Sequence, residues 1–193
     1  MGPQTSLLVL NIILLSFYSI VAKPNHNLIQ QTCKNISETD SNVSYKFCIN
    51  SLQSDPRSHG AKSLEKLGLA SIKLVRHNVT DTRAQIKEIL KKNKNKLDPF
   101  AKECLDDCLQ VYSDAIATIK EAIKDYKAKR YADSNVKLSS VIDASTTCED
   151  GFNQRNGVVS PLTKRNKDTF LLSAISLSII NMLNKDNLKD AEL

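Results

Sequence analysis

The sequence predicts an all-α protein: an up-down-up-down antiparallel four-helix bundle that carries an N-terminal helical hairpin. Three observations predict this fold. The 193 residues include only five glycines and five prolines, too few turn residues for many short strands. Four long segments place apolar residues three and four positions apart, and the connections between them are short. Apolar residues make up 41% of the chain, which is enough for a core in one domain.

The first 22 residues are predicted to be a signal peptide that is removed. Residues 7–20 form an apolar run without charged side chains, and Ala22 is a small residue suited to cleavage. We therefore expect a secreted mature chain that begins near Lys23 and has no membrane segment. The net charge of +6 survives cleavage, and outside the cell it favours acidic protein surfaces or acidic polysaccharides over nucleic acid.

Three sequons for N-glycosylation accompany the predicted secretion. They are Asn35-Ile36-Ser37, Asn42-Val43-Ser44 and Asn78-Val79-Thr80. We predict Asn35, Asn42 and Asn78 as glycosylation sites.

Residues 23–58 are expected to form the hairpin, and residues 59–185 the bundle. In the hairpin, Cys33 and Cys48 lie fifteen positions apart, and we interpret them as a disulfide that ties two short helices together. Asp55-Pro56-Arg57-Ser58 is predicted to end the hairpin as a turn.

The first two bundle helices are separated by a basic break. The first is expected from about Ala61 to Lys92, and residues 93–96 (NKNK) interrupt the pattern. Asp98-Pro99 then opens the second helix as N-cap and first helical residue. Its stripe buries one face and includes Cys104 and Cys108.

The other two bundle helices follow a junction near residues 127–130. Tyr131–Cys148 is predicted to be the third helix, ended by Asp150-Gly151. Ser160-Pro161 is predicted to start the last helix, which is nearly all apolar from Phe170 to Leu183. Residues 186–193 are expected to be a polar tail.

No catalytic, metal or cofactor motif is evident in the sequence. His26, His59 and His77 are scattered and have no metal-ligand spacing relative to cysteines or acids. The adjacent Asp106 and Asp107 point to different sides of a helix and do not make an acid–base pair. There is no Gly-rich loop and no nucleophile elbow, so the residues by themselves indicate no particular catalytic chemistry.

Five cysteines leave one thiol unpaired. Cys104 and Cys108 lie one turn apart on the same helix face, and either could reach Cys148. The spacing does not choose between them.

The residues resemble the plant invertase and pectin methylesterase inhibitor family from about His26 to Asn184. The similar motifs are QTCKN, YKFCINSLQSDPRS, DCLQVYSDAI and TTCEDGF. The invertase-inhibitor-like branch, which includes the plane-tree pollen allergen, is also similar in VKLSSVIDASTTCEDGF and VVSPLTKRNKDTFLLSAISLSI. The resemblance implies the bundle with its hairpin and two disulfides, Cys33–Cys48 and Cys108–Cys148, which leaves Cys104 as the free thiol.

The resemblance also implies a function without catalysis. Such proteins bind a cell-wall or vacuolar enzyme and block its cleft, so we expect an inhibitor of plant acid invertase in the apoplast or vacuole. The family's Pro-Lys-Phe contact segment aligns with Lys129, Arg130 and Tyr131, which we predict as target-binding residues. Lysine in place of proline removes a fixed φ and predicts a larger loss of conformational entropy on binding.

Three alternatives remain at this point. One is inhibition of pectin methylesterase, which the resemblance assigns to faces of the bundle helices. Another is a non-inhibitory, allergen-like pollen protein. The third is a small-molecule carrier, which would need a ligand cavity inside the bundle.

Overall fold

The computed structural model describes residues 26–93 and 96–191, and the predicted signal peptide lies outside these ranges. Within them every regular element is a helix, in the order α2 (His26–Thr39), α3 (Tyr45–Gln53), α4 (Pro56–His59), α5 (Leu64–Lys92), α6 (Pro99–Lys127), α7 (Tyr131–Asn153) and α8 (Thr163–Ala191). In this part of the chain no helix has the length and apolar character needed to cross a membrane.

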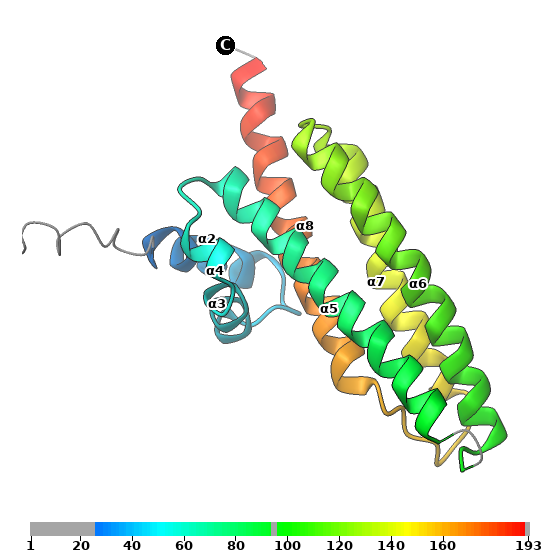
Figure 1. Cartoon of the computed structure of the whole chain (residues 1–193). Coiled ribbons are helices and arrows are strands. Elements are labelled where there is room, and N and C mark those ends of the chain that lie inside the picture. Colours follow the sequence, from blue (N-terminus) through cyan, green and yellow to red (C-terminus); the bar gives the residue numbers. More distant parts are fainter. Residues whose placement is uncertain (1–25, 94–95, 192–193) are drawn as a thin grey trace, which may run out of the picture.

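Helices α5 to α8 form the predicted four-helix bundle. Each packs against its neighbours in the chain, and α5 also packs against α8, which closes the bundle. Figure 1 shows the four long helices running alongside one another, with α2, α3 and α4 beside α5 and α8. The predicted architecture is confirmed.

Two apolar clusters hold these parts together. The larger fills the bundle and contains Tyr112, Leu105, Ile119, Leu138 and Phe152, all fully buried. The second joins the hairpin to the bundle, with side chains from α2 and α3 packed on side chains of α8. Its members include Ile36, Leu52, Ile175 and Ile179. The hairpin is therefore seated on the bundle by apolar contact.

Two disulfides join helices that the apolar clusters already pack together. Cys33–Cys48 connects α2 with α3, and Cys108–Cys148 connects α6 with α7, while Cys104 is a buried free thiol. On the loop-entropy model, closing the 40-residue separation of Cys108 and Cys148 stabilises the fold by about 4 kcal/mol. This is the pairing that the family resemblance implies.

Close approach of α5, α6 and α8 requires a glycine at position 68. A Cβ atom at Gly68 would lie 2.2 Å from Tyr126 Oη and 2.9 Å from Ile179 Cγ2. The Tyr126 hydroxyl donates a 2.8 Å hydrogen bond to the Glu65 carbonyl one turn earlier in α5. The absence of a side chain therefore lets a tyrosine of α6 lie directly against the backbone of α5.

Two boundaries near the hairpin differ from the prediction. The segment predicted as a turn is the short helix α4, because the Asp55 carboxylate accepts a 2.8 Å hydrogen bond from Arg57 N and caps it. Helix α5 starts at Leu64 and not near Ala61, since Ser63 is its N-cap and accepts from Lys66 N.

The boundaries around the α7–α8 connection were also wrong. Helix α7 continues through Gly151 to Asn153, because Phe152 is fully buried and extends the packed face. Helix α8 starts at Thr163 and not at Ser160-Pro161: the Ser160 hydroxyl accepts from Leu162 N in a turn that precedes the helix. It then continues past the predicted boundary at residue 185 to Ala191, so most of the predicted tail has a helical backbone.

Candidate functional site

The predicted target-binding residues lie at the turn that joins α6 to α7. Helix α6 ends at Lys127, Ala128 is its C-cap, and α7 begins at Tyr131. The Lys129 N–H donates to the Tyr126 carbonyl over 3.0 Å, and the Arg130 N–H donates to the Asp125 carbonyl over 2.9 Å. These two bonds form a Schellman motif, which satisfies the last carbonyls of α6 and fixes the path of the turn.

Lys129 occupies the left-handed position of this motif. Its φ is 59°, and it is the one non-glycine residue with positive φ in the described part of the chain. Glycine usually occupies this position, because a Cβ atom is crowded there, and asparagine is tolerated because its side chain can form local hydrogen bonds. Proline is excluded, since its φ is fixed near −65° and it lacks the N–H that donates to Tyr126. The turn is therefore ordered by backbone hydrogen bonds in a conformation that a proline could not adopt.

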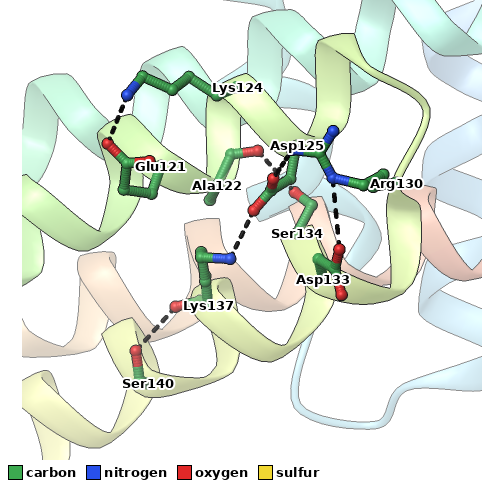
Figure 2. A network of polar contacts seen from close by, with 9 residues as sticks. All are labelled: Glu121, Ala122, Lys124, Asp125, Arg130, Asp133, Ser134, Lys137 and Ser140. Atoms are coloured by element: carbon green, nitrogen blue, oxygen red, sulfur yellow. Dashed lines mark hydrogen bonds and ion pairs between the residues drawn. The ribbon is translucent and has the colours of Figure 1, made fainter.

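Arg130 is exposed but engaged in ion pairs. Its side chain is 55% exposed and contacts two carboxylates, Asp125 by a short hydrogen bond and Asp133 at 3.4 Å. Figure 2 shows the guanidinium lying between these two acids. Part of its charge is therefore compensated within the protein.

Asp125 anchors the base of the turn. Its side chain is 9% exposed and also accepts a 2.5 Å hydrogen bond from Lys137 Nζ in α7. Hydrogen bonds from Lys137 and then from Arg130 hold the pKa of Asp125 below its ordinary value. Their effect outweighs that of burial, which acts to raise the pKa. Nearby, the Ser134 hydroxyl donates to the Ala122 carbonyl over 3.0 Å, so α6 and α7 are connected twice beside the turn (Figure 2).

Tyr131 points into the bundle. It is 4% exposed, and its ring meets that of Tyr126 edge-on with 5.1 Å between centroids. Its hydroxyl lies 3.5 Å from Glu65 Oε1, and burial raises its pKa. The structure therefore brings Lys129 and Arg130 to the surface and gives Tyr131 the role of supporting the turn from inside.

The remaining charge at the turn belongs to two lysines. Among the described residues, no carboxylate lies within ion-pair distance of Lys127 or Lys129, and both are exposed. The turn thus presents two uncompensated ammonium groups beside a partly compensated guanidinium. Such a surface suits a partner with a carboxylate-lined depression.

Sequence reasoning missed Asp125 and Lys137. Asp125 lies three residues after buried Ala122, next to the apolar stripe, and this position was the available signal for a buried acid. Nothing local marks Lys137 as its partner, because the pair depends on how α7 is rotated against α6.

The other predicted sites lie away from the turn. The side chains of Asn35 and Asn42 are exposed, while the half-buried Asn78 accepts a 2.7 Å hydrogen bond from the Thr169 hydroxyl. No group of three histidine, cysteine or acidic side chains in the described ranges is arranged to hold a metal ion.

Comparison with known proteins finds similar chains among plant enzyme inhibitors. The family model for the plant invertase/pectin methylesterase inhibitor matches residues 27–179. The chain is 45% identical over 157 residues to a protein of Platanus acerifolia named "Putative invertase inhibitor", covering 81% of this chain and 86% of that one. It is 33% identical to "Pectinesterase inhibitor 12" of Arabidopsis thaliana, covering 81% and 87% of the two chains. A crystal structure of a mutant pectin methylesterase inhibitor from Arabidopsis superposes with a TM-score of 0.62 at 25% identity, over 72% of this chain and 89% of that chain.

Proposed function

The chain belongs to the plant invertase/pectin methylesterase inhibitor family, and on this premise we propose that it is a secreted proteinaceous inhibitor of plant acid invertase. The observation that carries the choice of target is the 45% identity to the Platanus protein. The predicted signal peptide supports secretion into the cell wall, with the vacuole as the alternative compartment.

The α6–α7 turn supplies the proposed contact. Glycoside hydrolases cut their substrates between a pair of carboxylates, and a cation is the natural ligand for such a pair. Lys129 stands at the apex of the turn, and no carboxylate in the described residues lies within ion-pair distance of it, so its ammonium is available to the enzyme. Arg130 adds a planar fork beside it, already oriented by Asp125.

Order in the free turn favours tight binding. The two Schellman hydrogen bonds, the Asp125 ion pairs and the buried Tyr131 fix the backbone before any enzyme arrives. Less conformational entropy is then lost on association than a flexible lysine-containing loop would lose. This order offsets the loss expected from the absence of proline.

The test is a titration of the mature chain, starting at residue 23, against acid invertase at acid pH, with sucrose hydrolysis as the readout. Lys129→Ala should weaken inhibition by at least about tenfold, the equivalent of ~1.4 kcal/mol. Lys91→Ala is the control: it removes the same charge from the C-terminal end of α5, outside the α6–α7 turn, and should leave inhibition unchanged. Full sucrose hydrolysis at micromolar inhibitor would remove the proposal, and equal effects of the two variants would remove the turn from it.

Inhibition of pectin methylesterase is the second candidate. It is supported by the 33% identity to an Arabidopsis pectinesterase inhibitor and by the fold shared with a solved pectin methylesterase inhibitor. A methanol-release assay with the same variants distinguishes the two targets. If neither enzyme is inhibited, a non-inhibitory, allergen-like protein becomes the better description.

A further inference from the structure

A second charged surface lies where helix α4 meets helix α5. Arg57 of α4 and Lys73, Arg76, His77 and Thr80 of α5 line a hollow of about 570 Å³. We refer to these five residues as the basic hollow. None of them belongs to the α6–α7 turn.

The basic hollow carries cations that the protein does not neutralise. No described carboxylate lies within ion-pair distance of Lys73 or Arg76. The other two basic side chains have acidic partners: Arg57 pairs with Asp55 at 2.6 Å, and His77 Nδ1 lies 3.4 Å from Asp81. Four basic side chains thus face two carboxylates, and the balance of charge is positive.

The arrangement of these cations follows the axis of α5. Lys73, Arg76 and Thr80 are spaced by three and four residues, which places them on one face of the helix. At 1.5 Å per residue, this face extends roughly 10 Å along the axis from Lys73 to Thr80. A linear polyanion lying along α5 would meet both free cations at once.

We propose that the basic hollow binds the carboxylate groups of an acidic polysaccharide. The volume of the hollow lies in the range of sites that bind small molecules or a few sugar units. A protein partner with a flat surface would leave the hollow unfilled, so a saccharide fits better. Lys73 and Arg76 hold the carboxylates, and the Thr80 and Arg57 side chains offer hydrogen bonds to ring hydroxyls. The net charge of +6 draws a polyanion to the protein from a distance. The protein is thereby retained on an acidic polymer while the α6–α7 turn stays available.

The test measures binding of polygalacturonate to the mature chain by isothermal titration calorimetry at low salt. A fully methyl-esterified polymer of the same length reports any binding that does not need carboxylates. The double variant Lys73→Ser/Arg76→Ser empties the hollow of its free cations. Lys91→Ser/Lys120→Ser is the control, because it removes the same net charge from exposed positions where no described carboxylate lies within ion-pair distance.

Each exposed charge pair contributes a factor of about two to five in affinity, so the double variant should bind polygalacturonate about tenfold more weakly. The control should lose less than about threefold, and the esterified polymer should not bind. Equal losses in the two variants would overturn the proposal, because net charge alone would then explain the binding. Absence of binding by the unaltered chain, or equal binding of the esterified polymer, would overturn it as well.

A second measurement locates the contact without any substitution. Acetylation of surface lysines followed by peptide mapping should show that polygalacturonate protects Lys73 more than Lys91. Equal protection would overturn the assignment to the hollow. Invertase inhibition by the Lys73→Ser/Arg76→Ser variant should be unchanged. Failure of the polysaccharide proposal can therefore be distinguished from failure of the invertase proposal.

Discussion

The left-handed residue at the α6–α7 turn gives the sharpest prediction. Lys129 holds a φ of 59°, and its N–H is bonded to the Tyr126 carbonyl. An L-residue with a Cβ atom loses about 1–2 kcal/mol in this conformation, and glycine does not. Glycine also gives the unfolded chain more conformational entropy, which offsets about 0.5–1 kcal/mol of the stabilisation. Lys129→Gly should therefore raise the free energy of unfolding by about 0.5–1 kcal/mol.

Two companion variants isolate the cause. Lys129→Ala removes the same ammonium but keeps the Cβ atom, so it should leave the stability nearly unchanged. Lys129→Pro, which restores the family residue at the aligned position, should destabilise by about 3 kcal/mol or more, because φ and the hydrogen bond are both lost.

Urea unfolding followed by circular dichroism measures all three variants. In a domain of this size, 1 kcal/mol corresponds to about 2–4 °C in Tm, so thermal melts give an independent reading. Equal stability of the glycine and alanine variants would show that position 129 is not left-handed in solution. A neutral proline variant would refute the Schellman geometry and restore the simple alignment with the family's Pro-Lys-Phe segment.

Two further predictions concern the interior of the bundle. Gly68→Ala should destabilise by about 1–3 kcal/mol in urea unfolding, because its Cβ atom overlaps atoms of α6 and α8. Gly151→Ala, where a Cβ atom meets nothing within 4 Å, should stabilise by up to about 1 kcal/mol, and a loss at both positions would contradict this packing. Burial raises the pKa of Tyr112 to about 12, against about 10 for an unfolded tyrosine. The folded state favours the neutral phenol. The contribution of Tyr112 to the free energy of unfolding is therefore complete below pH ~10 and is lost as the pH rises through about 12. Burial also raises the pKa of Tyr126 and Tyr131, so absorbance titration near 295 nm should show several late-ionising tyrosines. Tyr112→Phe should reduce the amplitude of this late phase by one tyrosine, and an unchanged amplitude would rule out the assignment.

The periodic features of the chain could be predicted because they are local. Apolar residues at spacings of three and four define the long helices whatever they pack against, and Asp98-Pro99 marks a helix start through its own capping bonds. The cysteine pairing could not be predicted in this way, because spacing left Cys104 and Cys108 equivalent. The family resemblance implied that Cys108 pairs with Cys148, and the structure contains this disulfide.

Helix ends were predicted less well, because tertiary packing moves them. Gly151 has the local preference of a helix terminator, yet burial of Phe152 carries α7 past it. Ser160-Pro161 has the composition of a helix start, yet the Ser160 hydroxyl caps a turn and α8 begins later.

The sequence by itself determined how many long helices there are and which residues join α6 to α7. Only the tertiary structure decided what those residues do, because the rotation of one helix against another is set by the whole core. That rotation buries Tyr131, pairs Asp125 with Lys137 across the turn and leaves Lys129 as the exposed cation. The same packing brings Arg57 beside Lys73 and Arg76, which local periodicity does not place together.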